Sequence, residues 1–169
     1  AERLNSMPKP SAKAMVSIVY GGDSYLNDQR VRDLTHQALN AYPDADVVEL
    51  DATDADRYAF DEAVSPSLLA DRAIVVRNRQ NADEKLGDVI AAYCGQSNND
   101  ANASPVICQH EGGTKGKRIH DLIIKAGARE EKVPDLKKAD AKINFVMQQF
   151  ERRHRRVDPM AAQQLVAVL

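Results

Sequence analysis

The sequence predicts a doubly wound α/β domain, in which a parallel sheet of five strands is covered by helices on both faces. Short apolar runs typical of buried strands alternate with amphipathic helical patterns five times along the chain. The length of 169 residues suits one domain with a full core, or one domain plus a small appendage. Hydrophobic residues make up 43% and charged residues 28%, which is typical of a globular protein.

Each predicted strand is a short β-rich run bounded by glycine, proline or polar residues. The predicted strands span residues 15–20, 46–50, 73–77, 105–109 and 128–133. Helices are expected in the intervals, the first capped by Asp23 or Ser24 and ended by Pro43. Residues 67–70 are expected to form a single helical turn, after the break at residues 65–67.

Both ends of the chain differ from this central pattern. Residues 1–14 are polar with two prolines, and we expect a loose tail there. The domain is expected over residues 15–156 and to end in a long helix with an apolar stripe over residues 143–150. A helix then restarts at Asp158 and Pro159, so residues 157–169 are interpreted as the beginning of a truncated helical domain.

Composition excludes several classes of protein. The net charge of −2 argues against a chain-wide binder of nucleic acid, so any such contact would be local or indirect. No apolar run reaches the length of a membrane span and no secretory signal is present, so no membrane contact is expected. Cys94 and Cys108 fit no CxxC pattern and indicate reduced thiols in a cytoplasmic protein.

The first strand-to-helix turn, residues 21–24 (GGDS), occupies the place where nucleotide-binding folds carry their phosphate loop. A P-loop requires a lysine for the terminal phosphates, a hydroxyl for magnesium and a second glycine at fixed spacing. The turn has neither the lysine nor that glycine, and Asp23 would repel phosphate. The sequence therefore predicts a tight turn with a helix cap, and no cofactor.

Two basic segments are candidates for contact with phosphate. Residues 112–118 (GGTKGKR) resemble a P-loop only superficially, because the glycine spacing is too short and Arg118 replaces the hydroxyl residue. Lys115, Lys117 and Arg118 could contact DNA or phosphate non-specifically, or form a solvated basic loop. The same choice applies to a cluster of four arginines at a predicted helix end, Arg152, Arg153, Arg155 and Arg156.

Catalytic and metal-binding signatures are missing from the sequence. The four histidines have no metal-ligand spacing, and the acidic run over residues 44–62 lacks the glycine and glutamate of a calcium loop. No Gly-x-Ser-x-Gly elbow is present. The sequence therefore predicts no catalytic residue and no metal site.

Leu68 and Leu69 form the most informative apolar pair. Adjacent residues of a helical turn point about 100° apart, so both side chains cannot easily face one core. From spacing alone, the pair either covers the core or is exposed as a protein-contact site.

Three blocks in order resemble the delta subunit of the bacterial DNA polymerase III clamp loader. Residues 19–26 (VYGGDSYL) are similar to its first strand and turn. Residues 65–77 (SPSLLADRAIVVR) are similar to its small apolar helix, "ADR" and following strand. Residues 141–162 match its long helix and the entry to its next domain, with Phe145 in place of a common tryptophan. The resemblance covers about residues 15 to 169.

The resemblance implies a RecA-like AAA+ three-layer domain followed by the start of a helical lid domain. It implies an ATP-independent, non-catalytic subunit of the polymerase III holoenzyme, a nucleotidyltransferase complex. Its partner would be the beta sliding clamp, which such subunits open with two adjacent apolar residues. Those correspond to Leu68 and Leu69, flanked by Ser67; the family often has phenylalanine at the second position. Other loader subunits would bind through a C-terminal domain, and primer-template DNA would be contacted indirectly.

Three alternatives remain open from the sequence. The first is a P-loop-like NTPase or nucleotide kinase that holds phosphate in residues 112–118. The second is a flavodoxin-like adaptor module with a cation site around Asp51 and Asp54. The third is a dedicated DNA-binding domain that uses the arginine cluster of residues 152–156.

Overall fold

The computed structural model describes residues 15–135, 143 and 145–149. Residues 15–135 form five strands, four α-helices and one short 3-10 helix. In chain order these are β1 (Val16–Tyr20), α2 (Ser24–Ala41), β2 (Asp46–Asp51), α3 (Arg57–Val64), β3 (Arg72–Arg77), η2 (Arg79–Asn81), α4 (Glu84–Ser97), β4 (Val106–His110), α5 (Lys117–Lys125) and β5 (Arg129–Lys132).

The strands form one parallel sheet in the order β2-β3-β4-β1-β5. Val16 of β1 and Ile74 of β3 both pair with Val106 of β4, which makes β4 the centre of the sheet. The three inner strands carry most of the buried apolar residues, whereas the edge strands β2 and β5 are mostly exposed and polar. The predicted five-stranded parallel sheet is confirmed, each strand lying within a residue or two of its predicted bounds.

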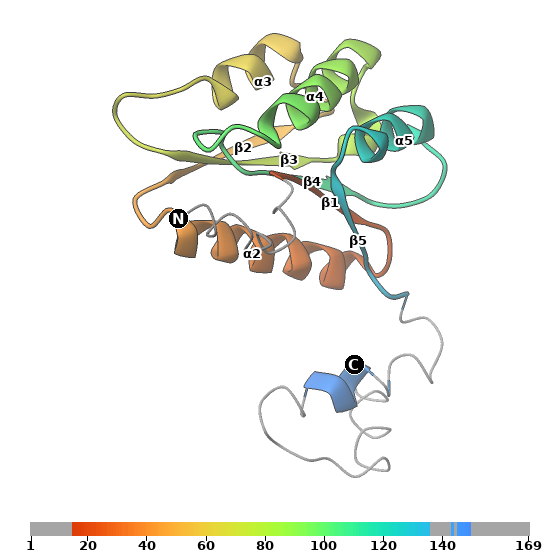
Figure 1. Ribbon diagram of the computed structural model, residues 1–169. Helices are drawn as coiled ribbons and strands as arrows, with labels where there is room; N and C mark the ends of the chain where they lie inside the picture. The colour runs from red at the N-terminus through yellow and green to blue at the C-terminus, as the bar shows by residue number, and fades with distance from the viewer. Residues whose placement is uncertain (1–14, 136–142, 144, 150–169) are drawn as a thin grey trace, which may run out of the picture. The chain divides into compact units, whose positions relative to one another are not determined.

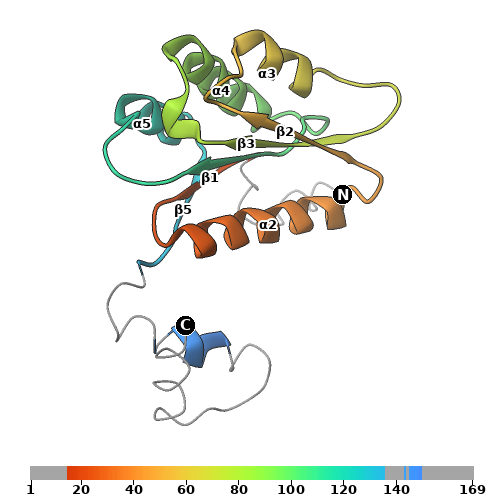
Figure 2. The same cartoon turned by 180° about the vertical axis from the view of Figure 1, so that it is seen from behind.

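Helices cover both faces of the sheet unequally (Figure 1). Helix α2 lies on one face, and α3, α4 and α5 lie side by side on the other, as the view from behind also shows (Figure 2). The larger core lies beneath the three helices and includes Phe60, Ile74 and Ile90. The smaller core joins α2 to the sheet through Val31 and Leu34. The predicted three-layer arrangement follows from this packing.

Aspartate side chains fix where three helices begin. The carboxylate of Asp23 accepts a hydrogen bond from the Tyr25 N–H at 3.0 Å, as the sequence predicted. Asp56 and Asp83 cap α3 and α4 in the same way. Because each cap directly follows a strand or a short loop, the connections at the carboxyl edge of the sheet are short and well defined.

Two local features differ from the prediction. Residues 67–70 form a bend and no helical turn, because the Ser67 hydroxyl accepts a hydrogen bond from the Leu69 N–H at 3.1 Å in place of a backbone carbonyl. The helix η2 was not predicted; it begins after Asn78, whose left-handed φ of 54° turns the chain directly at the end of β3.

Several predictions concern residues that the structure does not describe. The chain divides into two compact units between Val133 and Pro134. In the second unit, Ile143 and residues 145–149 are helical, in the segment where a long helix was expected. The N-terminal tail, the arginine cluster and the start of a helical domain at residue 157 lie outside the described residues.

Two further expectations can be compared with the described part of the chain. Cys94 and Cys108 are buried and unbonded to one another, and burial raises the pKa of Cys108 to about 12, which keeps its thiol protonated and unreactive. None of the helices seen in the described residues has the length and apolar character needed to cross a bilayer.

Two glycines of α4 provide a matched test of the packing between α4 and α5. A β-carbon at Gly87 would stand 2.5 Å from Ile119 Cγ2, whereas one at Gly95 would meet nothing within 4 Å. We expect Gly87→Ala to lower the free energy of unfolding by about 1–3 kcal/mol through overpacking. Gly95→Ala should raise it by up to about 1 kcal/mol through helix propensity. Urea unfolding measures both; equal effects would contradict the packing.

Candidate functional site

The loop between α3 and β3, residues 65–71, presents the two leucines to solvent. The exposed fractions of Leu68 and Leu69 are 105% and 96%, the highest among the large hydrophobic residues described. The loop protrudes at the edge of the sheet where β3 begins (Figure 1). The interpretation of the pair as core cover is therefore wrong. Adjacent, fully exposed leucines are typical of a protein-contact site. We refer to residues 65–71 as the leucine loop.

Polar contacts hold the two ends of the leucine loop together. The Arg72 guanidinium, at the start of β3, donates from Nη1 to the carbonyl oxygen of Glu62 at 3.0 Å and to that of Ala63 at 3.4 Å. The Ser65 hydroxyl donates to the Asp61 carbonyl at 2.6 Å. The last turn of α3 and the first residue of β3 are thereby joined, so the leucine loop begins and ends on fixed positions.

At the carboxyl ends of the strands, opposite the leucine loop, the β1–α2 turn is closed against the end of β4. The Gly21 N–H donates to the His110 carbonyl at 2.9 Å. The buried Asn27 side chain donates to the carbonyls of Gly21 and His110, at 2.9 and 3.0 Å. A β-carbon at Gly112 would stand 2.9 Å from Gly21 Cα. The turn therefore packs on the chain beside it, where a P-loop would surround phosphates.

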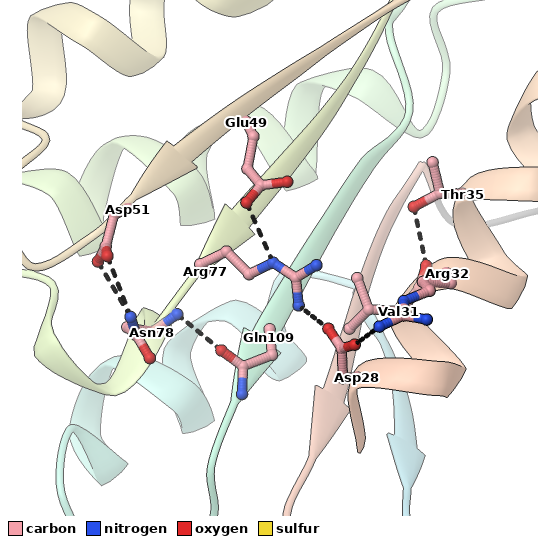
Figure 3. Close-up of polar contacts among 9 residues, drawn as sticks. All are labelled: Asp28, Val31, Arg32, Thr35, Glu49, Asp51, Arg77, Asn78 and Gln109. Atoms are coloured by element: carbon pink, nitrogen blue, oxygen red, sulfur yellow. Dashed lines mark hydrogen bonds and ion pairs between the residues drawn. The ribbon is translucent and has the colours of Figure 1, made fainter. Parts of the chain in front are cut away.

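Cationic and amide side chains occupy the end of β3 (Figure 3). Arg77 contacts two carboxylates, Asp28 of α2 at 2.6 Å and Glu49 of β2 at 3.4 Å, and Asp28 is also paired with Arg32. Burial raises the pKa of Asp28, but hydrogen bonds and charge from Arg77 and Arg32 outweigh it and hold the pKa below its ordinary value. These carboxylates are thus engaged in ion pairs.

The alternative cation site around Asp51 is not supported. The Asp51 carboxylate accepts a hydrogen bond from the Thr53 N–H, and further bonds from the Asn78 side chain (Figure 3). These bonds lower the pKa of Asp51. Among the described residues, no group of three or more metal-ligating side chains comes together. The strand order also differs from the flavodoxin-like order, in which β1 lies between β2 and β3.

His110 organises the loop between β4 and α5, residues 111–116. Its Nδ1 accepts from the Gly112 N–H at 2.8 Å, so the ring hydrogen resides on Nε2, which donates to the Lys115 carbonyl at 3.0 Å. Burial and the nearby Arg79 charge lower the pKa of His110 to about 4. A neutral, fully buried imidazole therefore joins the beginning and end of this loop.

The three basic residues predicted for phosphate contact lie together at the start of α5. All three are exposed. Lys117 is paired with Asp121 at 3.2 Å and Arg118 with Glu84 at 2.9 Å, while Lys115 forms no ion pair with any described residue. Exposed ion pairs of this kind add little to the stability of the fold, so their side chains can readily change partners. The structure brings these residues together, and their contact with DNA or phosphate stays a prediction.

An open pocket of about 270 Å³ lies beside the same loop. Its walls include Tyr20, His110 and His120, whose rings contact one another with centroids 4.7 to 5.4 Å apart. His120 bonds Glu130 at 2.6 Å between Nε2 and Oε2, and the Tyr20 hydroxyl donates to the Gly113 carbonyl at 2.7 Å. The His120 and Tyr20 side chains in the walls of the pocket are thus hydrogen-bonded to groups of the protein itself.

The architecture is a RecA-like three-layer α/β fold. Its sheet is parallel with β1 between β4 and β5, and its first strand-to-helix turn here lacks a phosphate loop. Neither a protein-family model nor a curated protein sequence matches the chain.

Among solved structures, the chain is similar to the Bacillus subtilis DNA clamp loader delta protein. The TM-score is 0.67 at 16% identity, over 89% of this chain and 47% of that one. It is also similar to a DNA polymerase III gamma-subunit-related protein of Thermotoga maritima, with a TM-score of 0.50 and 14% identity, over 92% of this chain and 54% of that one. The predicted likeness is confirmed at the level of the fold, and the chain spans about half the length of these proteins.

Three functional-site residues at the carboxyl edge were not predicted from the sequence. Asn27, Arg79 and His110 are buried and polar. Asn27 and Arg79 bond the backbone of residues that are distant in the sequence, whereas His110 bonds the backbone of the loop that follows it. Only His110 carried a signal, since it stands at a strand end. The bonding of Asn27 and Arg79 depends on strand order, which a single sequence does not reveal.

His110 makes the stability of the domain depend on pH. Its pKa is about 4 in the folded chain against an ordinary 6.5, so between these values only the unfolded chain takes up a proton. The free energy of unfolding therefore falls as the pH falls through this window, by about 3 kcal/mol in all.

Urea unfolding at several pH values from 7 to 4.5 measures this dependence. We expect His110→Gln to flatten it, and His36→Gln, at an exposed position of α2, to leave it unchanged. An unaltered slope in His110→Gln would show that another group titrates.

Proposed function

We propose that the chain is the clamp-binding part of a clamp-loader delta subunit, which binds and opens the beta sliding clamp during DNA replication. The proposal rests on one observation, the two adjacent leucines that are fully exposed on a loop with fixed ends. The likeness in fold to the Bacillus subtilis clamp loader delta protein supports it. Ser67 contributes by bonding the Leu69 N–H, which favours one conformation of the pair.

Opening of the clamp would proceed by differential binding. A protein that binds an open ring more tightly than a closed one shifts the equilibrium toward opening by its difference in affinity. Burial of two leucine side chains would contribute roughly 3–6 kcal/mol to the complex. Because the leucine loop already has fixed ends, little of this energy would be lost in ordering it.

In this proposal the chain is not an enzyme and acts without ATP. The closed β1–α2 turn supports this, since Gly21 and Asn27 bond the end of β4 and Gly112 packs against the turn. At the end of β3, Arg77 forms ion pairs with the carboxylates of Asp28 and Glu49, which would otherwise be candidate ligands for magnesium. Other loader subunits would bind through a further domain, the protein would act in the cytoplasm, and primer-template DNA would be contacted indirectly.

Truncation of the two leucines tests the proposal. We expect Leu68→Ala with Leu69→Ala to weaken binding to a bacterial sliding clamp by at least about 100-fold, because two apolar anchors are lost. The fold should be intact, since neither side chain packs in the core. Surface plasmon resonance with immobilised clamp gives the affinity.

Tyr25→Ala is a matched control, because Tyr25 is also an exposed apolar residue, 67% accessible, at the first turn of α2. It should leave clamp binding unchanged. Unchanged affinity in the double leucine variant would refute the assignment of the leucine loop.

A titration with ATP separates the proposal from the NTPase alternative. We expect no magnesium-dependent heat of binding in calorimetry and no chemical-shift change at the amides of Gly21 and Gly22, because their turn is closed. Magnesium-dependent binding that shifts those amides would favour the enzyme.

A further inference from the structure

Four consecutive carbonyl groups of the β4–α5 loop, at residues 113–116, accept hydrogen bonds from the chain itself. Those of Gly113, Lys115 and Gly116 accept from the Tyr20 hydroxyl, the His110 ring and the Arg79 guanidinium, respectively. The Thr114 carbonyl accepts from the Lys117 N–H. Four consecutive acceptors are therefore used internally.

The N–H groups of the same segment are free. Those of residues 113–116, and of Arg118 and Ile119 in the first turn of α5, have no acceptor among the described residues. Three glycines with positive φ, at positions 112, 113 and 116, permit this backbone conformation. A run of unpaired backbone N–H groups that leads into a helix N-terminus is favourable for an anion, since the helix dipole acts in the same direction.

A buried arginine lies directly beneath the start of α5. Arg79 has an exposed fraction of 0%, and its Nη2 donates to the carbonyl of Gly116, the cap residue of α5, at 3.2 Å. Its Nε and Nη1 have no hydrogen-bond partner in the part of the chain that the structure describes, nor does any described carboxylate pair with it. A guanidinium stays charged when buried, and without a counter-charge it is costly. Its charge acts through a low-dielectric interior on the loop above it.

We propose that the β4–α5 loop and the first turn of α5 bind a phosphate group, carried by a nucleic-acid backbone or by a free nucleotide. The free N–H groups contact the phosphate oxygens, and Arg79 supplies the opposite charge from within the domain. This cradle stands after the fourth strand, whereas P-loop proteins carry theirs after the first. It lies at the opposite edge of the sheet from the leucine loop, so it does not depend on clamp binding.

Exposed charges modulate the site without defining it. Lys115 is unpaired among the described residues and stands within the row of N–H groups. Lys117 and Arg118 would exchange their exposed carboxylate partners for phosphate. Glu111 and Asp121 oppose an anion, so the affinity for one phosphate group should be modest and should rise with several phosphates in a chain.

An NMR titration of the full 169-residue chain with inorganic phosphate, at constant ionic strength, tests the proposal. We expect saturable shifts of the amides of residues 113–119 and none in the leucine loop. Two competition experiments show whether the phosphate group belongs to a nucleic-acid backbone or to a free nucleotide. Displacement by a short DNA duplex at lower concentration than by ATP without magnesium identifies a nucleic-acid backbone, and the reverse order identifies a free nucleotide.

Variants locate the charge that matters. Arg79→Met, which keeps an unbranched stem and removes the charge, should weaken phosphate binding by at least about fivefold. Arg32→Met, at an exposed arginine of α2, is the matched control and should have no effect. If Arg79→Met does not fold, Lys115→Glu at the exposed loop should weaken binding by about threefold or more.

The absence of saturable shifts with phosphate, duplex and ATP alike would overturn the proposal. So would a folded Arg79→Met chain, or a Lys115→Glu chain, with unchanged affinity. None of these outcomes bears on the clamp, because the leucine-loop variants are assayed without phosphate ligand.

Discussion

The close approach of Gly21 and Gly112 determines what the carboxyl edge of the sheet can do. The two backbones meet because neither residue has a side chain, and His110 and Asn27 hold the strand ends beneath them. In parallel α/β sheets, this edge is the usual place for a ligand. Here the first turn is filled by the chain itself, and an open pocket lies beside the β4–α5 loop.

The two ends of the parallel strands, amino and carboxyl, therefore offer different chemistry. The edge where β3 begins carries an apolar pair on a loop anchored by Arg72, and apolar burial suits a protein partner. The carboxyl edge carries free N–H groups and exposed lysines above a buried guanidinium, which suits an anion. Because a rigid sheet separates the two edges, each can be altered without disturbing the other.

The sequence allowed the fold to be predicted better than the sites. Alternating short apolar runs and helical stripes are local signals, and all five strands and the Asp23 cap of the first helix followed from them. The prediction of a helical turn over residues 67–70 was wrong, because the Leu69 N–H donates to the Ser67 side-chain oxygen and to no backbone carbonyl among the described residues. Spacing alone could not decide whether Leu68 and Leu69 were exposed. The role of Arg79 depends on which strands are neighbours, and that information is non-local.

Hydrogen–deuterium exchange of the chain, free and bound to a sliding clamp, tests the central claim most directly. If the chain binds the clamp through its leucine loop, protection from exchange should be confined to residues 65–71 and the adjoining ends of α3 and β3. The β1–α2 turn should exchange at the same rate in both states. Protection of that turn or of α2, with residues 65–71 unchanged, would contradict the account.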